Sequence, residues 1–166
     1  MAHDADEVEF ERFVRLIRHW LRKEAYDICG DWHEAEDLVQ IALFKMYQHW
    51  NRLDRRTALG AYARRIVVRN FLTERRRPRW RHESATTSIT TTDIALAPTP
   101  HTAVDDRVYL SPALRRLGPR QRAVLALRFF HDLSVTQTAH ALGCATGTVT
   151  SQTVRALAAL RRDLQT

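Results

Sequence analysis

The stretch Leu133-Ser134-Val135-Thr136-Gln137-Thr138-Ala139-His140-Ala141-Leu142-Gly143, continued by Cys144-Ala145-Thr146-Gly147-Thr148-Val149-Thr150-Ser151-Gln152, decides the fold of the C-terminal part of this chain. It predicts a short helix, a tight turn at Gly143 and a second helix, which is the order of a helix-turn-helix. Small hydroxyl and amide side chains remain on the outer face of the second helix, the face that such a motif presents to the DNA major groove. We expect these apolar side chains to pack the two helices together: Val135, Ala139, Leu142, Val149, Val154 and Leu157.

The charge of the chain is positive and unevenly distributed. The 166 residues carry a net charge of +7, which favours a polyanionic partner. Residues 51–82 contain eleven arginines opposed by Asp54 and Glu74, whereas residues 1–50 contain eleven acidic and six basic side chains. One surface is therefore expected to meet phosphate, and another is not.

Membrane partners and catalysis are not expected. No apolar run approaches the about 18 residues that a membrane span needs, and the acidic start of the chain is unlike a secretory signal. Cys29 and Cys144 lie far apart, and the eight histidines show no HExxH spacing. No glycine-rich phosphate loop or GxSxG motif occurs either. We expect a soluble cytoplasmic protein that is not an enzyme and has no metal site and no cofactor.

Helical periodicity dominates the chain and predicts an all-α fold. A first helix is expected over about residues 7–28, and Asp31 and Thr57 are plausible caps for a second and a third helix. A fourth helical segment is expected near 107–117, and a small core under the helix-turn-helix should contain Val124, Leu125, Leu127 and Phe129. A stretch rich in Ser, Thr and Pro predicts a flexible linker. The chain is thus divided into two small helical domains and a linker: residues 5–80, 106–164 and 81–105.

Two separate segments resemble one protein family. The segment Asp31-Trp32-His33-Glu34-Ala35-Glu36-Asp37-Leu38-Val39-Gln40 resembles region 2 of bacterial RNA polymerase sigma factors of the extracytoplasmic-function (ECF) type. The segment Gly118-Pro119-Arg120-Gln121-Arg122-Ala123-Val124-Leu125, followed by the helix-turn-helix, resembles region 4 of the same family. The resemblance covers nearly the whole chain apart from the linker. It implies a protein that binds core RNA polymerase and directs promoter-specific transcription initiation.

The resemblance also implies roles for individual residues in the first domain. In the family, the region 2 helix docks against the clamp of the largest polymerase subunit, which places Glu34, Asp37, Leu38 and Gln40 at that contact. The following loop captures a flipped base of the −10 promoter element, and the next helix holds the backbone of the opened strand. These residues are thereby assigned to the −10 element: Asn51, Arg52, Arg64, Arg65, Arg69, Asn70, Arg75 and Arg76.

The recognition helix of the second domain is expected to contact the −35 element. Arg155 suits a bidentate contact to guanine, and Gln152 suits one to adenine. Many family members carry Lys or Arg where this chain has Thr150 and Gln152, and Ser where it has Ala145, so we expect fewer phosphate contacts and a weaker helix cap. The candidate −35 residues are Thr146, Thr148, Thr150, Ser151, Gln152 and Arg155.

A free-standing helix-turn-helix regulator is the main alternative. It explains residues 106–164 but leaves the region 2-like helix and the arginine-rich third helix without a role. Many ECF sigma factors are held inactive by an anti-sigma protein that clamps both domains, and a flexible linker would permit such a clamp. An anti-sigma protein is therefore a further candidate partner, beside core RNA polymerase and promoter DNA.

Overall fold

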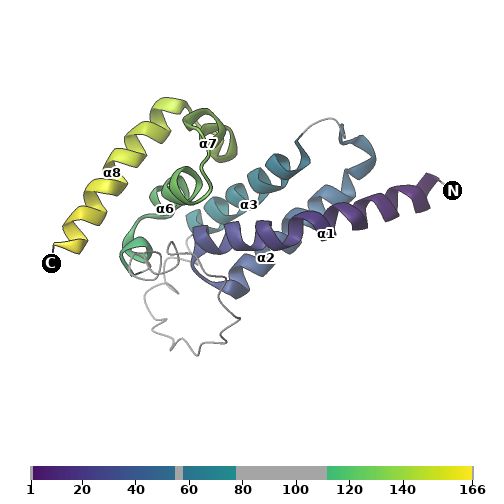
Figure 1. Cartoon of the computed structure of the whole chain (residues 1–166), viewed down its shortest axis with the longest axis horizontal. Helices are drawn as coiled ribbons and strands as arrows, with labels where there is room; N and C mark the ends of the chain where they lie inside the picture. Colours follow the sequence, from purple (N-terminus) through teal and green to yellow (C-terminus); the bar gives the residue numbers. More distant parts are fainter. Residues whose placement is uncertain (1, 55–57, 78–111, 166) are drawn as a thin grey trace.

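The computed structural model describes residues 2–54, 58–77 and 112–165, and within these ranges it contains helices and no strand (Figure 1). The N-terminal bundle is built from α1 (Ala2–Cys29), α2 (Trp32–Gln48) and α3 (Leu59–Arg76), with a single 3₁₀ turn at Trp50–Arg52 between α2 and α3. The C-terminal domain contains α6 (Pro119–Leu125), a π-helical turn (Ala126–Phe130), α7 (Val135–Leu142) and α8 (Thr146–Leu164). The predicted all-α fold and its helix-turn-helix are confirmed.

Local hydrogen bonds explain why several of these helices begin and end where they do. The Asp31 carboxylate accepts a hydrogen bond of 2.8 Å from the Glu34 N–H and caps α2 as predicted. A reciprocal capping box starts α7: the Ser134 hydroxyl accepts from the Gln137 N–H at 3.1 Å, and the Gln137 side chain accepts from the Ser134 N–H at 2.9 Å. The N-cap of α8 is Ala145, which makes no side-chain hydrogen bond, so the expected weaker cap is confirmed.

Two sequence predictions concern segments that the structure does not describe. The proposed cap of the third helix, Thr57, and the proposed linker 81–105 both lie outside the described residues. The predicted helix near 107–117 is described in part, since residues 112–116 are helical.

The largest buried cluster contains side chains from both ends of the chain. Leu21 and Ile28 of α1 and Val39 of α2 share it with Leu127 and Val149 of the C-terminal domain. A second, smaller cluster lies within the C-terminal domain and consists of Ala113, Leu117, Leu125, Ala156 and Leu160. The main hydrophobic core is therefore continuous between the N-terminal bundle and the helix-turn-helix.

Three side chains that the sequence assigned to the core are exposed. Phe129 is 51% exposed, because the π-helical turn Ala126–Phe130 changes the helical register that the periodicity assumed. Val154 is 63% exposed, and Leu157 is also exposed. At about 100° per residue, Val154 lies roughly 140° around α8 from the buried Val149. The inward face of α8 consists instead of Val149, Ala156 and Leu160.

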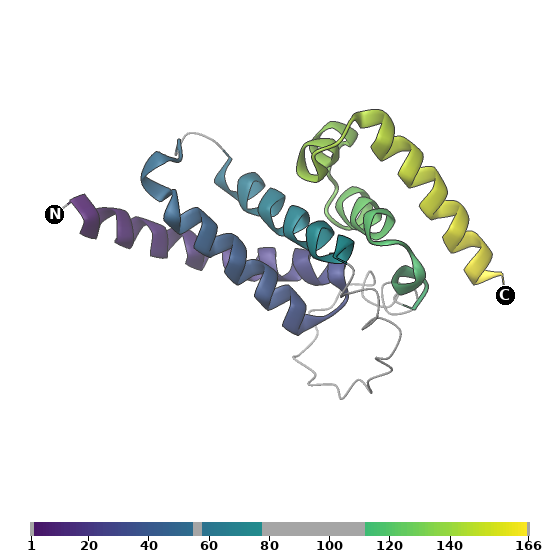
Figure 2. The same ribbon diagram turned by 180° about the vertical axis from the view of Figure 1, so that it is seen from behind.

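The C-terminal helices pack directly on the N-terminal bundle. Seen from both sides, α1, α2 and α3 run beside one another, and the compact α6–α7 pair lies against them with α8 on its far side (Figures 1 and 2). The contacts join α7 to α3, and α6 to both α1 and α3. This arrangement brings the helix-turn-helix onto the arginine-rich third helix.

The turn between α7 and α8 needs glycine at position 143. Gly143 has φ +64° and ends α7, and a Cβ there would clash with the guanidinium of Arg69. We expect Gly143→Ala to lower the free energy of unfolding by about 1–2 kcal/mol, because a Cβ disfavours the left-handed conformation. Chemical denaturation followed by circular dichroism measures this change.

Gly147→Ala is the matched control for that prediction. A Cβ at Gly147 meets nothing within 4 Å, and the residue lies in the first turn of α8. Alanine there should leave the stability unchanged or raise it by up to about 1 kcal/mol. Equal effects of the two substitutions would contradict the role assigned to Gly143.

Candidate nucleic-acid interface

The outer side of α2 carries a stripe of exposed side chains at helical spacing. Asp37, Gln40, Ile41, Phe44 and Gln48 recur at three- and four-residue steps, and Phe44 is 61% exposed. A shallow hollow on this face is lined by Gln40, Ile41, Phe44, Lys45 and Gln48. Exposed apolar residues rimmed by polar ones are typical of a surface that contacts another protein. We call this set the α2 stripe.

The structure divides the four residues that the sequence assigned to polymerase binding. Asp37 and Gln40 lie on the α2 stripe, whereas Leu38 is only 3% exposed and belongs to the core. Glu34 is partly buried and pairs with Arg75 at 2.7 Å. Burial raises the pKa of Glu34, and the nearby Arg75 and Arg122 act in the opposite direction. The exposed Ile41 and Phe44 were missed, although their spacing from Asp37 could have identified them.

The loop that follows α2 is held by an aromatic cluster. Trp50 is buried and packs against Phe10 and Phe13 of α1, with ring centroids 5.0 and 5.2 Å apart. Asn51 and Arg52, the next two residues of the 3₁₀ turn, are exposed. The turn therefore presents the two predicted −10 residues to solvent on a firmly packed base.

Two of the arginines predicted to hold DNA form ion pairs within the N-terminal bundle. Arg64 pairs with Glu24, a carboxylate only 2% exposed, through two hydrogen bonds, and its guanidinium lies 5.5 Å from the Trp20 ring. Arg75 makes the pair with Glu34 described above. Asn70, in turn, accepts a hydrogen bond of 2.9 Å from Lys45 of α2. These contacts join α3 to its neighbours and fix the direction in which its remaining arginines project.

Arg65 and Arg69 project from α3 toward the helix-turn-helix. The Arg65 guanidinium lies 3.1 Å from Nε2 of His140 in α7. The Arg69 guanidinium lies against the turn at Gly143, where α7 ends. Arg76 is exposed in the last turn of α3. Arg65 is half-buried, whereas Arg69 and Arg76 are exposed, so the C-terminal domain contacts two of these three arginines without covering them completely.

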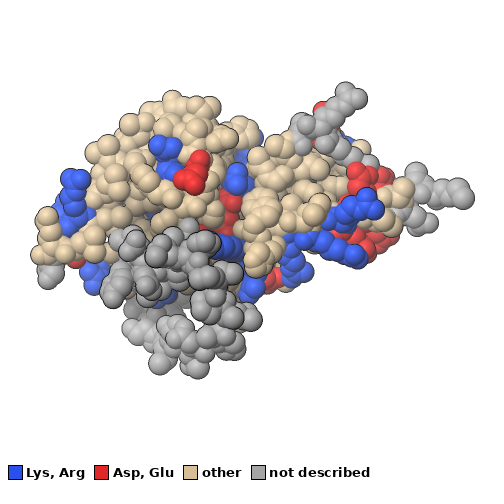
Figure 3. Space-filling model, in the orientation of Figure 1, with Lys and Arg blue, Asp and Glu red and all other residues tan. Residues whose placement is uncertain are grey.

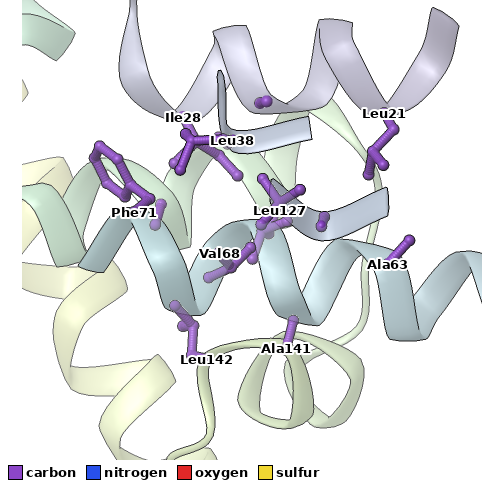
Figure 4. Close-up of a cluster of buried hydrophobic side chains, with 14 of the residues drawn as sticks. Leu21, Ile28, Leu38, Ala63, Val68, Phe71, Leu127, Ala141 and Leu142 are labelled. Atoms are coloured by element: carbon purple, nitrogen blue, oxygen red, sulfur yellow. The ribbon is translucent and has the colours of Figure 1, made fainter. Parts of the chain in front are cut away.

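The same side of α3 carries buried apolar residues that the sequence analysis missed. Val68 and Leu72 are buried, and with Arg65 and Arg69 they form a stripe at positions i, i+3, i+4 and i+7. In Figure 4, Ala141 and Leu142 point from α7 toward α3, and Leu127 lies in the same cluster. We call Arg65, Val68, Arg69 and Leu72 the α3 stripe. The available signal for a second packed face was the helical spacing of Val68 and Leu72, four positions apart beside Arg65 and Arg69.

Further polar contacts connect the two domains. His131, which follows the π-helical turn, lies 3.0 Å from the Asp27 carboxylate of α1. Arg122 of α6 is buried near Glu34 and Cys29, with its guanidinium 5.7 Å from the Phe71 ring. Burial lowers the pKa of Arg122, and its neighbour Arg75 adds to the effect. Charged groups of both domains are thus enclosed in their interface.

The predicted −35 residues occupy the first three turns of α8. Thr146, Thr150, Ser151 and Arg155 are exposed, and Thr148 and Gln152 are half-buried. The Thr150 and Ser151 hydroxyls donate to the carbonyl oxygens of Thr146 and Thr148 at 3.2 and 3.1 Å. Their outward lone pairs can accept from base amino groups, while Arg155 supplies a full positive charge.

Acidic and basic side chains lie side by side on the face of the molecule in Figure 3. On α1, for example, Arg18 and Arg22 both pair with Glu36 of α2. Within the described residues, no group of three or more His, Cys, Asp or Glu side chains could hold a metal ion. Among the helices of the described ranges, none is long and apolar enough to cross a membrane.

An arginine-rich helical bundle joined to a helix-turn-helix is typical of a DNA-binding protein that acts in transcription. Comparisons with known proteins identify the family. Residues 3–81 match Sigma-70 region 2, and residues 113–162 match Sigma-70, region 4. The chain is 36% identical over 165 residues to an RNA polymerase sigma-E factor of Streptomyces avermitilis, covering 99% of this chain and 89% of the relative. It is 32% identical over 146 residues to the ECF RNA polymerase sigma factor SigL of Mycobacterium tuberculosis, covering 87% and 82%.

A solved structure resembles the whole chain. The sigma factor RpoE of Bartonella quintana, in complex with the anti-sigma factor NepR, is 26% identical with a TM-score of 0.69, covering 95% of this chain and 97% of that one. The protein belongs to the ECF family of RNA polymerase sigma factors. It is a transcription initiation factor, and the polymerase carries out the chemistry. The match over residues 3–81 also excludes the alternative of a free-standing helix-turn-helix regulator.

The buried Glu24–Arg64 pair should contribute strongly to stability. Glu24→Gln removes the negative charge and leaves the Arg64 guanidinium without a counter-ion in a mostly buried site. We expect the free energy of unfolding to fall by about 3 kcal/mol, measured by chemical denaturation. Glu11→Gln removes an exposed carboxylate from the same helix, where it pairs with Arg15, and should change the stability by less than about 0.5 kcal/mol. Similar values for the two variants would rule out a structural role for Arg64.

Proposed function

We propose that the two helical domains bind core RNA polymerase together and recognise a promoter at two elements, the −10 and the −35 element. The observation that carries this proposal is the pair of family matches, region 2 and region 4, on one chain. The domain boundaries that we propose are residues 5–80 and 106–164, with a linker over 81–105. The protein works in the cytoplasm, where the polymerase and the chromosome are.

The α2 stripe is the polymerase-docking surface in this proposal. Its exposed Ile41 and Phe44 supply apolar contact area, and Asp37 supplies a negative charge beside them. A basic surface on the polymerase clamp complements this charge, which favours correct orientation and fast association. The buried Leu38 supports the α2 stripe from the core. Glu34, beside the stripe, helps to hold α2 against α3 through its ion pair with Arg75.

The 3₁₀ turn and the exposed side of α3 read the −10 element in this proposal. Asn51 and Arg52 contact the flipped base, and Arg65, Arg69 and Arg76 hold the phosphates of the opened strand. Arg64, Arg75 and Asn70 hold α3 in position for this contact, because their side chains are bound to Glu24, Glu34 and Lys45. A cationic surface with only a few phosphate contacts gives salt-sensitive, modest affinity, so stable promoter binding depends on the polymerase.

The start of α8 reads the −35 element in this proposal, with Arg155 as the principal contact to guanine and Gln152 as a contact to adenine. The residues that complete this surface are Thr146, Thr148, Thr150 and Ser151. An anti-sigma protein is a candidate regulator, since the similar sigma factor of Bartonella quintana was solved with one. Such a protein would keep both domains away from the polymerase.

Reconstitution with core RNA polymerase tests the proposed function. Purified protein should direct transcription from a distinct set of promoters on genomic DNA, measured by sequencing the 5′ ends of the transcripts. Asp37→Arg should weaken polymerase binding at least tenfold and abolish these transcripts, because it reverses the charge of the α2 stripe. Glu11→Arg makes the same charge change on the exposed side of α1 and should leave binding unchanged. Promoter-specific transcription that survives Asp37→Arg would reject the docking surface, and its absence in the wild type would reject the function.

Arg155→Ala tests the assignment of −35 recognition. A bidentate contact to guanine contributes about 1–3 kcal/mol of discrimination, so transcription should lose at least fivefold of its preference between promoters that differ in the −35 element. The measurement is the ratio of transcripts from two such promoters in the same reaction. Arg161→Ala, an exposed arginine in the last turn of the same helix, should leave the ratio unchanged. A ratio unchanged by Arg155→Ala would remove that residue from base recognition.

A further inference from the structure

Two arginines of the C-terminal domain converge on the turn that follows α1. Gly30 in this turn has φ +80°, and its N–H donates to the Tyr26 carbonyl oxygen at 2.7 Å. The point at which a Cβ of residue 30 would stand lies 3.9 Å from Nε of Arg115 and 4.0 Å from Nη1 of Arg122. Beyond the neighbouring residues of the turn, no atom of the described chain is nearer to this point than 3.9 Å. Gly30 therefore leaves room for a small group beside both guanidinium groups.

A third arginine, Arg75 of α3, lies close to Arg122. The guanidinium carbon atoms of Arg75 and Arg122 lie 5.1 and 5.7 Å from the centre of the same buried ring, that of Phe71. Burial lowers the pKa of Arg122, and the like charges of Arg75 and Arg115 add to this effect. Three positive charges are thus close enough to repel one another. We call Arg75, Arg115 and Arg122 the arginine cluster.

The carboxylates nearby do not balance the arginine cluster. Glu34 pairs with Arg75 at 2.7 Å and lies near Arg122. Asp31 is exposed, and its carboxylate accepts the hydrogen bond that caps α2. Among the ion pairs of the residues that the structure describes, none involves Arg115 or Arg122. Three guanidinium groups therefore share one partly buried carboxylate.

Arg122 is the member of the cluster that most needs an anion. It is only 8% exposed, and its Nε has no hydrogen-bond partner. The Phe71 ring stabilises part of the charge by a cation–π contact but carries no negative charge. The thiol of Cys29, which lies nearby, does not supply an anion either, because burial raises its pKa to about 12. Buried charges in proteins are normally paired and hydrogen-bonded, which Arg122 is not.

We propose that the arginine cluster binds a small phosphate-type oxyanion beside Gly30, between the two domains. A guanidinium presents its N–H groups as a planar fork that matches the oxygens of a phosphate. Arg115 is exposed, so the anion reaches the cluster from solvent. Arg75 belongs to α3, and the other two arginines belong to the C-terminal domain, so the bound anion strengthens the contact between the domains. Binding of this anion does not depend on the proposed recognition of promoters.

Two variants of the cluster and their matched controls test the site. Arg115→Gln removes the exposed cation beside Gly30, whereas Arg116→Gln removes the next arginine, which lies 3.9 Å from Asp163. Arg122→Met replaces the buried guanidinium with an unbranched apolar side chain, and Arg116→Met makes the same change at an exposed position.

Inorganic phosphate is the probe, added to the full chain in a chloride buffer of matched ionic strength. We expect saturable binding to the wild type and to both Arg116 variants, measured by titration calorimetry and phosphorus NMR. Arg115→Gln should weaken binding at least about tenfold, and Arg122→Met should abolish it, because each removes a charged hydrogen-bond donor. Phosphate should also raise the Tm of the wild type more than that of either cluster variant, since the anion binds only the folded chain. Without phosphate, Arg122→Met should have a higher Tm than the wild type, because it removes an unpaired buried charge.

The outcomes separate this site from its alternatives. Absence of saturable phosphate binding, or an equal rise of Tm in the wild type and in both cluster variants, would overturn it. ATP tests the source of the phosphate group: tighter binding than inorganic phosphate, weakened by Arg115→Gln, would indicate a nucleotide. A single-stranded oligonucleotide that loses affinity in Arg115→Gln, when phosphate does not bind, would assign the cluster to DNA and reject the small-anion site.

Circular dichroism checks the fold of each variant. If Arg122→Met unfolds the protein, the comparison of Arg115→Gln with Arg116→Gln decides alone. None of these measurements uses polymerase or a promoter, so a negative result does not bear on the sigma function.

Discussion

The structure depends on the burial of two sides of a single helix, α3. One side packs Ala63, Val67 and Phe71 into the N-terminal bundle, and the α3 stripe packs Val68 and Leu72 against the C-terminal domain. Four arginines of α3 lie against other parts of the protein: Arg64 at Glu24, Arg75 at Glu34, Arg65 at His140 and Arg69 at the end of α7. Arg69 and Arg76 keep exposed side chains. The second packed side of α3, together with the contacts of α6 with α1, makes the core continuous between the two domains.

Local sequence signals predicted the parts of this fold that depend on neighbouring residues. The cap at Asp31, the tight turn at Gly143 and the weaker cap of α8 each depend on a few adjacent positions, and the structure has all three. The Glu24–Arg64 pair could not be predicted, because the two residues are 40 positions apart and no helical spacing relates them. The exposed Phe129 was also unpredictable, since a π-helical turn breaks the periodicity on which the assignment rested.

The predicted site residues lie on the helices that the sequence predicted, but not all of them lie on a surface. Asp37 and Gln40 are exposed on α2, and Arg65 and Arg69 lie on α3. The sequence could not distinguish Asp37 and Gln40 from Leu38, which is in the core. Distinguishing an exposed residue from its buried neighbour requires the tertiary contacts of the whole helix. Those contacts come partly from the C-terminal domain, which is distant in sequence.

The interface between the domains combines apolar contacts with a buried cation, Arg122. Arg122 is buried beside Arg75, a like charge that together with burial lowers its pKa, and its Nε has no hydrogen-bond partner. A buried guanidinium with an unsatisfied N–H weakens an interface that its apolar residues would otherwise hold firmly. The apolar side chains of the shared core must therefore offset the cost of burying Arg122, a cost that the nearby Glu34 carboxylate reduces.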